Sequence, residues 1–285
     1  MNDKITVLSL AEKKARGEKI TAVTTYDFPS ARLVDQAGID VALVGDTVSM
    51  VVAGRPDTLA ATVDEMIYHT RAARRGIARA LLVGDMPYGS YHVSEEEAVR
   101  NALRIVKEAG AEAVKLEGGR KQAPLVERLV RSGIPVMGHI GLTPQSVHLL
   151  GGYRVQGKTV EAGRALLEDA RALSASGAFA IVLEGIPREI AAWITAEVPL
   201  PTIGIGAGPD CDGQVLVFHD LLGLSAGPLP KFVRRYADLG DQIRRALDSY
   251  IAEVRSGAFP ADQESYHLPA SEQEKMQPNG AGRLR

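Results

Sequence analysis

Four acidic residues each stand at the end of a short apolar run: Asp46 in VALVGD, Asp85 in LLVGD, Glu117 in AVKLEGG and Glu184 in AFAIVLEG. A carboxylate that ends a buried strand is costly to desolvate unless it is paired or bound to a cation. Because cysteine is absent and histidine scarce around Asp46, Asp85 and Glu117, these hard oxygen donors favour Mg²⁺ or Mn²⁺ over zinc. Glu184 ends a later run and is a candidate general base.

Other polar residues follow the same apolar runs. Lys115 lies two residues before Glu117, so both side chains share one face of a strand. An ion pair that closes the end of a barrel is the structural alternative, but the position of all four acids at strand ends favours function. His139 in VMGHIGL is equally consistent with a structural and a functional role. In the Tyr26-Asp27 pair, Asp27 is slightly favoured as a helix N-cap over a substrate ligand.

Two glycine-rich segments also lie near predicted strand ends. The sequence GIGAG, with Gly204, Gly206 and Gly208, can hold phosphate on backbone N–H groups or allow tight turns. The segment 138–158 is predicted to be a long loop, either a mobile lid or a loop packed on the barrel.

The elements that position these residues alternate regularly between strand and helix. Strands are predicted at residues 20–25, 41–45, 80–83, 113–116, 134–137, 180–183, 201–205 and 222–225. Helices are predicted at residues 29–37, 62–75, 94–109, 124–131, 159–176, 187–197 and 212–219. This order indicates an α/β protein with a (β/α)8 TIM barrel, in which active sites lie at the carboxyl ends of the strands. A doubly wound open sheet is the alternative.

The barrel is predicted to form a single catalytic domain over residues 1–260, including an amphipathic helical extension within 231–255. Residues 261–285 are polar, with no apolar period, and are predicted to form a disordered tail.

Composition excludes several classes of function. The 285 residues are 45% hydrophobic, enough for a large core, and the formal charge of -2 favours neither nucleic acid nor an anionic membrane. With Cys211 as the one cysteine, neither an intrachain disulfide nor a cysteine zinc site is possible. No apolar run has the length of a signal peptide or a membrane span, so a cytoplasmic protein is expected.

The chain resembles the ketopantoate hydroxymethyltransferase family (3-methyl-2-oxobutanoate hydroxymethyltransferases) from about residue 20 to about residue 240. The resemblance is carried by TTYDFPSARLVD, VGDTVSMVVAG, TVDEMIYHTRAARRG, AVKLEGG, GHIGLTPQSVHLLGGYRVQGK, IVLEGIP, PTIGIGAGPDCDGQVLVFHDLLG and PKFVRRYADL. It implies transfer of a hydroxymethyl group from 5,10-methylenetetrahydrofolate to 3-methyl-2-oxobutanoate by a homo-oligomer, a decamer.

The resemblance also implies roles for individual residues. Mg²⁺ would bind at Asp46, Asp85 and Glu117, and Glu184 would be the general base. The keto acid would contact Asp46, Thr47, Asp85, Lys115 and His139. Many relatives carry Ser where Thr47 stands, and they often carry Gly at Ser49 and His at Arg55. Thr47 keeps the hydroxyl and the backbone N–H, whereas Ser49 and Arg55 concern the local loop.

Two alternatives share parts of this pattern. The first is a Mg²⁺-dependent keto-acid lyase or mutase of the phosphoenolpyruvate mutase/isocitrate lyase group, which shares the enolate chemistry. The isocitrate lyases require a cysteine in a Lys-Lys-Cys-Gly-His context, which Cys211 in PDCDG does not supply. The second is a non-catalytic metabolite binder, which would bind the keto acid without exchanging its C3 proton.

Overall fold

The computed structural model describes residues 4–276 and contains a closed barrel of eight parallel strands in chain order. The strands are β1 (Ile20–Thr24), β2 (Val41–Val44), β3 (Leu81–Asp85), β4 (Ala113–Glu117), β5 (Val136–Gly141), β6 (Ala180–Glu184), β7 (Thr202–Ile205) and β8 (Gly213–Leu216). Strand β8 pairs with both β7 and β1 and so closes the ring. The predicted (β/α)8 barrel is confirmed.

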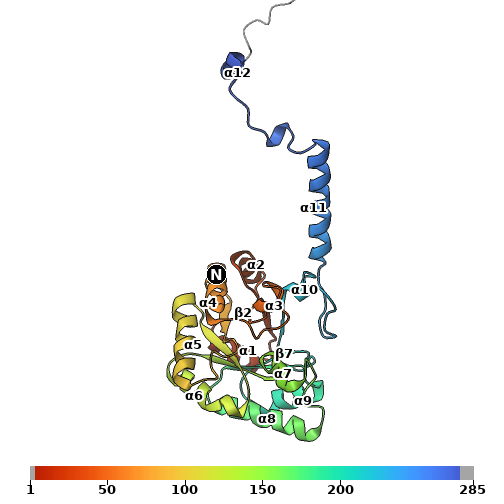
Figure 1. Ribbon diagram of the computed structural model, residues 1–285. Helices are drawn as coiled ribbons and strands as arrows, with labels where there is room; N and C mark the ends of the chain where they lie inside the picture. The colour runs from red at the N-terminus through yellow and green to blue at the C-terminus, as the bar shows by residue number, and fades with distance from the viewer. Residues whose placement is uncertain (1–3, 277–285) are drawn as a thin grey trace, which may run out of the picture. The chain divides into compact units, whose positions relative to one another are not determined.

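Helices follow the strands and surround the barrel (Figure 1). They are α1 (Val7–Ala15), α2 (Phe28–Gln36), α3 (Val48–Val51), α4 (Val63–Arg74), α5 (Glu95–Ala109), α6 (Ala123–Arg131), α7 (Val147–Leu150), α8 (Val160–Ala175), α9 (Arg188–Glu197) and α10 (Phe218–Leu221). Two short 3₁₀ helices, η1 (Arg120–Gln122) and η2 (Pro144–Ser146), lie in the connections after β4 and β5.

Side-chain caps begin several of these helices. The hydroxyl of Thr62 accepts a hydrogen bond from the backbone N–H of Glu65, whose carboxylate in turn accepts from the backbone N–H of Thr62. The carboxylate of Asp27 accepts from the backbone N–H of Ser30 at 2.8 Å, so Asp27 is the N-cap of α2 as predicted. These bonds satisfy N–H groups that have no partner inside the helix.

Helix α1 was not predicted, and it closes the amino end of the barrel. Leu10 is fully buried in one cluster with Ile20 and Val41, the first residues of β1 and β2. Lys14 donates to the carboxylate of Asp212 at 2.9 Å. It also donates to the backbone carbonyl of Thr195 in α9 and to that of Leu200, which follows α9. The amino end is therefore packed shut, which leaves the carboxyl end as the open end of the barrel.

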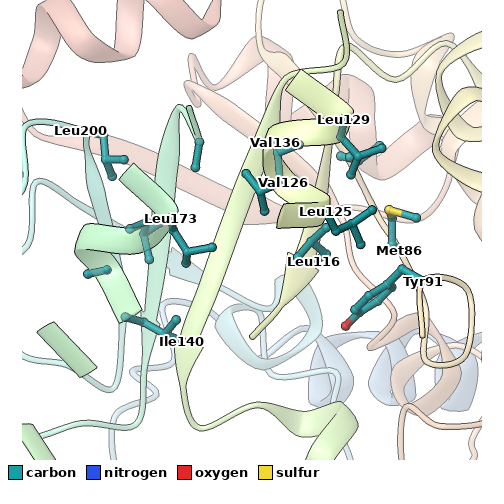
Figure 2. Packing of buried hydrophobic residues seen from close by; sticks show 14 of the residues in the cluster. Met86, Tyr91, Leu116, Leu125, Val126, Leu129, Val136, Ile140, Leu173 and Leu200 are labelled. Atoms are coloured by element: carbon teal, nitrogen blue, oxygen red, sulfur yellow. The ribbon is translucent and has the colours of Figure 1, made fainter. Parts of the chain in front are cut away.

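A larger apolar core lies between the strands and the outer helices. Figure 2 shows Leu125, Val126 and Leu129 of α6 together with Leu116 of β4 and Val136 of β5. The three α6 positions recur at helical spacing and form the apolar stripe of an amphipathic helix. This packing holds β4 and β5 in place relative to each other.

The sequence-based prediction is wrong in the last barrel unit. The pattern predicts a helix over 212–219 and a strand over 222–225, but β8 occupies Gly213–Leu216 and α10 occupies Phe218–Leu221. Strand β8 forms because it pairs with β1 and β7, and this long-range pairing decides between helix and strand for a short apolar run. A Cβ at position 213 would lie 2.5 Å from the carbonyl oxygen of Ile20, so glycine permits this close pairing.

Strand β5 is also longer than predicted. It reaches Gly141, so His139 lies on the strand and pairs in register with Glu117. The predicted loop over 138–158 therefore begins later, and it contains η2 and α7.

The chain divides into two compact units, Met1–Ala237 and Asp238–Arg285. The first contains the barrel, and the second contains α11 (Leu239–Ser256), a 3₁₀ helix η3 (Asp262–Glu264) and α12 (Ala270–Met276). The expected domain boundary at residue 260 and the expected disordered tail stay predictions, and residues 277–285 of that tail lie outside the described residues. Within residues 4–276, no helix has the length and apolar character that crossing a membrane requires.

Candidate active site at the carboxyl end of the barrel

The carboxyl ends of the strands surround a cavity of about 60 Å³. Every side chain that the sequence proposed for the site lines this cavity: Asp46, Thr47, Asp85, Lys115, Glu117, His139 and Glu184. Its apolar wall consists mainly of Leu43, Val182, Ile205, Val215, Leu216 and Val217. The structure thus brings the proposed residues together, as expected for strand ends of a parallel barrel.

Strand register explains why these side chains are neighbours. Asp85 at the end of β3 is paired with Lys115 of β4, and Glu117 of β4 is paired with His139 of β5. Glu184 ends β6, the next strand. Because residues two apart on a strand point the same way, Lys115 and Glu117 both face the cavity.

Lys115 is the central cation of the site. Its Nζ lies 2.9 Å from Oδ1 of Asp85 and 3.4 Å from Nδ1 of His139, and all three side chains are buried. Burial alone would lower the pKa of Lys115, but the negative charges of Asp85, Glu117 and Asp46 outweigh burial and raise that pKa. Lys115 therefore stays positively charged inside the barrel.

Asp46 and Asp85 are held close together despite their like charges. The backbone N–H of Asp46 donates to Oδ2 of Asp85 at 3.2 Å. Burial raises the pKa of both carboxyl groups, and the charges of Asp85 and Glu117 raise the pKa of Asp46 further. Oδ1 of Asp85 faces Lys115 but is not aligned for a hydrogen bond, so this buried oxygen lacks a hydrogen-bond partner within the described chain.

His139 lies between two acids on opposite sides of its ring. Its Nδ1 is 3.3 Å from Oε1 of Glu117, and its Nε2 is 3.2 Å from Oε2 of Glu184 without hydrogen-bond alignment. Burial and the charge of Lys115 lower the pKa of His139, but Glu117 and Glu184 outweigh them and raise it to about 9. Burial would raise the pKa of Glu117, yet the hydrogen bond and charge of His139 lower it.

The acids of the site outnumber its cations. Four carboxyl groups face two cationic groups, Lys115 and His139, and the raised pKa values of Asp46 and Asp85 show that the site disfavours ionisation of all four. A divalent cation would favour the ionised form of these acids. Among residues 4–276, no three His, Cys, Asp or Glu side chains are placed to hold a metal by themselves. Water or substrate oxygens would have to complete the coordination shell, which is the usual behaviour of Mg²⁺. The residues present therefore fit Mg²⁺.

Thr47 is held at the edge of the cavity by Tyr26. The hydroxyl groups of the two residues are 2.7 Å apart, and Tyr26 is buried with an exposed fraction of 2%. A Cβ at position 45 would lie 2.9 Å from Oγ1 of Thr47, so Gly45 allows Thr47 to pack back over the preceding turn.

Two residues of the site, Gln145 and Tyr91, were not predicted from the sequence. The side chain of Gln145 donates to Oδ2 of Asp46 at 2.9 Å, and its backbone N–H donates to Oε2 of Glu117 at 3.0 Å. The hydroxyl of Tyr91 donates to Oε1 of Gln145 at 2.5 Å. The one signal available in the sequence was a polar residue directly after Thr143-Pro144, within the segment that follows β5.

The glycines of the GIGAG segment serve tight turns. Gly206 and Gly208 have positive φ angles of 62° and 80°. A Cβ on Gly208 would lie 2.4 Å from Cβ of Arg188, and one on Gly206 would lie 2.7 Å from the ring of Phe232. These contacts account for the glycines without a bound phosphate.

Ser49 and Arg55, the two departures from many relatives, act on the loop between α3 and α4. The hydroxyl of Ser49 donates to the carbonyl of Asp57 at 2.8 Å. Arg55 makes two hydrogen bonds to the carboxylate of Glu65, at 2.6 and 3.2 Å, and one to the carbonyl of Ala60. Neither Ser49 nor Arg55 lines the cavity, so both stabilise the loop and do not contact the side chains of the site.

Comparison with known proteins identifies the family. The profile of the ketopantoate hydroxymethyltransferase family matches residues 4–262. The chain belongs to this family. A 3-methyl-2-oxobutanoate hydroxymethyltransferase of Koribacter versatilis is 56% identical over 274 residues, which cover 96% of this chain and 93% of that protein. One of Pelobacter propionicus is 55% identical over 267 residues, which cover 94% and 99% of the two chains. The resemblance to hydroxymethyltransferases, and with it the prediction of a transferase, is confirmed.

Solved structures of more distant proteins share the fold of the hydroxymethyltransferase family. A phosphonopyruvate hydrolase in complex with oxalate and Mg²⁺ has a TM-score of 0.59 at 12% identity and covers 96% of this chain and 95% of its own. A 2,3-dimethylmalate lyase of the phosphoenolpyruvate mutase/isocitrate lyase superfamily has a TM-score of 0.59 at 16% identity, with 92% coverage of both chains. At these identities the likeness is one of fold. Cys211 is fully buried and does not line the cavity, so it supplies no nucleophile there.

The Arg55–Glu65 pair gives a pH-dependent prediction. The hydrogen bonds from Arg55 lower the pKa of Glu65 from 4.5 to about 2. Because the folded-state pKa is the lower one, the pair stabilises the folded protein fully above about pH 4.5, and the stabilisation is lost as the pH falls toward 2. We expect Arg55→Ala to return the pKa of Glu65 toward 4.5, as measured by NMR titration of its side-chain carboxyl carbon. Arg16→Ala, which removes an ion pair elsewhere, should leave the Glu65 titration unchanged; an unchanged Glu65 pKa in Arg55→Ala would contradict the assignment.

Proposed function

We propose that this chain transfers a hydroxymethyl group from 5,10-methylenetetrahydrofolate to 3-methyl-2-oxobutanoate, which gives 2-dehydropantoate. Membership of the family supports this reaction. The observation that carries the proposal is one small cavity that brings together several kinds of group. It is lined by the cations Lys115 and His139, the carboxylates of Asp46 and Asp85, the candidate base Glu184 and an apolar wall.

The cavity offers both ends of the keto acid a suitable surface. Lys115 and His139 are cations that can position the substrate carboxylate and offset negative charge that develops during the reaction. Leu43, Val182 and Val215 line the same cavity and present an apolar surface to the isopropyl group. The small volume favours a short, branched keto acid.

The carboxylates of Asp46 and Asp85, with Glu117 beside them, would hold the metal. A bound Mg²⁺ would supply a Lewis acid that withdraws electron density from the keto group of the substrate. The protein contributes by keeping these acids in place, because the backbone N–H of Asp46 and the ammonium group of Lys115 fix the carboxylate of Asp85.

Glu184 would remove the C3 proton. It is paired in register with Ile205 of the apolar wall, so an isopropyl group on that wall would bring its C3–H bond toward the Glu184 carboxylate. The C3–H bond breaks, its proton moves to Glu184, and the electron pair forms the enolate of the substrate. Water adds to the methylene carbon of the folate and both C–N bonds of that carbon break, which releases tetrahydrofolate and leaves the carbon at the oxidation level of formaldehyde. The enolate carbon bonds to this carbon, and its oxygen takes up the proton held by Glu184 and becomes the hydroxyl group of 2-dehydropantoate.

We also propose, from the family resemblance, that the chain forms a homo-oligomer, a decamer. Helix α11 supports association, because Ile243, Leu247, Ile251 and Val254 recur at helical spacing and form an apolar stripe that needs a partner surface. Light scattering of the purified protein should give a mass several times 30.4 kDa, and a monomeric mass would contradict the proposal.

The function itself can be tested by proton exchange in D₂O. NMR should show loss of the C3–H signal of 3-methyl-2-oxobutanoate in the presence of the protein and Mg²⁺, and formation of 2-dehydropantoate once 5,10-methylenetetrahydrofolate is added. EDTA should abolish the exchange because it would remove the Lewis acid that withdraws electron density from the keto group. Exchange without condensation would assign the site to another keto-acid enzyme, and binding of the keto acid without exchange would indicate a non-catalytic binder.

Substitution of the base separates chemistry from binding. Glu184→Gln keeps the size of the side chain but removes the group that accepts the proton, so we expect C3–H exchange and kcat to fall by roughly 10² to 10⁴. Keto-acid affinity, measured by calorimetry, should change by less than about threefold, because general-base catalysis acts on the transition state. Glu189→Gln, at an exposed position of α9, is the matched control. Exchange at the wild-type rate in Glu184→Gln would show that another group is the base.

A further inference from the structure

One uncharged residue joins the acids that lie on different strands of the site. Gln145, on η2, is buried with an exposed fraction of 4%. Its Nε2 donates to Oδ2 of Asp46 at 2.9 Å and to the carbonyl oxygen of Met86 at 3.0 Å. Its Oε1 accepts from the hydroxyl of Tyr91 at 2.5 Å. Both amide hydrogens and the amide oxygen of Gln145 are therefore used.

These partners permit only one orientation of the Gln145 amide. If the amide were turned over, Oε1 would face the carboxylate of Asp46 and the carbonyl of Met86, both of which are acceptors. The hydroxyl of Tyr91 is itself held, because it accepts from the backbone N–H of Glu117 at 3.2 Å. Its single hydrogen has Oε1 of Gln145 as the nearer acceptor, at 2.5 Å, and the carbonyl oxygen of Glu117 as a more distant one, at 3.4 Å. Tyr91 also belongs to the rigid apolar core (Figure 2).

The backbone of Gln145 provides a second connection. Its N–H donates to Oε2 of Glu117 at 3.0 Å. Gln145 thus contacts an acid that follows β2, an acid that ends β4, and the carbonyl of Met86, the residue directly after Asp85. One residue ties together the strand ends that carry all three acids of the site.

The contact with Asp46 counteracts a repulsion. Asp46 lies among like-charged carboxylates of Asp85 and Glu117, so without a donor its side chain would turn away from them. Gln145 occupies Oδ2 of Asp46 and leaves Oδ1 for another ligand. We propose that Gln145, locked by Tyr91, is a positioning residue that holds the Asp46 carboxylate in the orientation required to bind the divalent cation. This proposal rests on the metal role in the proposed function.

The test measures metal binding without substrate. Gln145→Met keeps the length of the side chain but removes both amide hydrogens, and Tyr91→Phe removes one hydroxyl. Mn²⁺, used as the probe, is titrated into each substrate-free protein and the free ion is followed by electron paramagnetic resonance. We expect each variant to bind Mn²⁺ about tenfold or more weakly, as is usual when a partner of a metal ligand is lost. The double variant should bind no more weakly than Gln145→Met, because Tyr91 acts through Gln145.

Controls separate positioning from simple loss of structure. Tyr88→Phe, in the same loop as Tyr91 but half exposed, and Gln156→Met, whose side chain bonds only to the carbonyl of Arg154, should bind Mn²⁺ like the wild type. The unfolding temperature of each metal-free variant is measured alongside.

Three results would overturn the proposal. Wild-type Mn²⁺ affinity in Gln145→Met, with or without a lowered unfolding temperature, would make Gln145 only an anchor of its loop. Additive losses in the double variant would show that Tyr91 does not act through Gln145. Absence of Mn²⁺ binding in the wild type would overturn the metal role in the proposed function together with this proposal. This outcome differs from failure of the Gln145 proposal alone, in which the wild type binds Mn²⁺ and the variants bind it equally well.

Discussion

The buried negative charge at the carboxyl end of the barrel is the constraint on which the site depends. Four carboxyl groups lie in one small cavity with two cationic groups, Lys115 and His139, and the pKa values of Asp46 and Asp85 are raised there. Unpaired charge in a protein interior costs several kcal/mol per ion, so such a cluster persists only where the surrounding structure fixes it and a ligand completes it. The closed amino end, the packed core and the hydrogen bonds to the acids all serve to keep these charges in place.

The protein fixes the two sides of the cavity by different means. On the β4–β5 side, strand register alone makes neighbours of Lys115, Glu117 and His139, and α6 packs behind these strands. On the β2 side, Asp46 and Thr47 lie beyond the residues of β2 that pair with neighbouring strands, so strand pairing does not hold them. Hydrogen bonds with Gln145 and Tyr26 hold their side chains instead. The second side is therefore the one that single side-chain changes should loosen most.

The same difference explains what the sequence could predict. Asp85, Glu117 and Glu184 end apolar strands, and strand order brings such ends together in any parallel barrel, so their convergence followed from local pattern. Gln145 was missed because its role depends on a hydrogen bond to a residue 99 positions away, which no local pattern indicates. The position of β8 was missed for a similar reason, since pairing with β1 decides its conformation. Helix α1 was missed because its buried face is defined by strand ends from the whole barrel, such as Ile20 and Val41.

Burial also separates the proposed base from the acids proposed to hold the metal. The side chains of Asp85 and Glu117 are 2% and 3% exposed, whereas that of Glu184 is 16% exposed. A group that holds a cation keeps its charge throughout the reaction, but a base gains a proton and must later release it to water. In the proposed reaction, transfer of the C3 proton to Glu184 would move one negative charge from its carboxylate to the substrate, so the total charge of the cavity would not change. His139 lies 3.2 Å from the Glu184 carboxylate and 3.4 Å from Lys115, so the two cations of the cavity are already close to the group that would gain the proton.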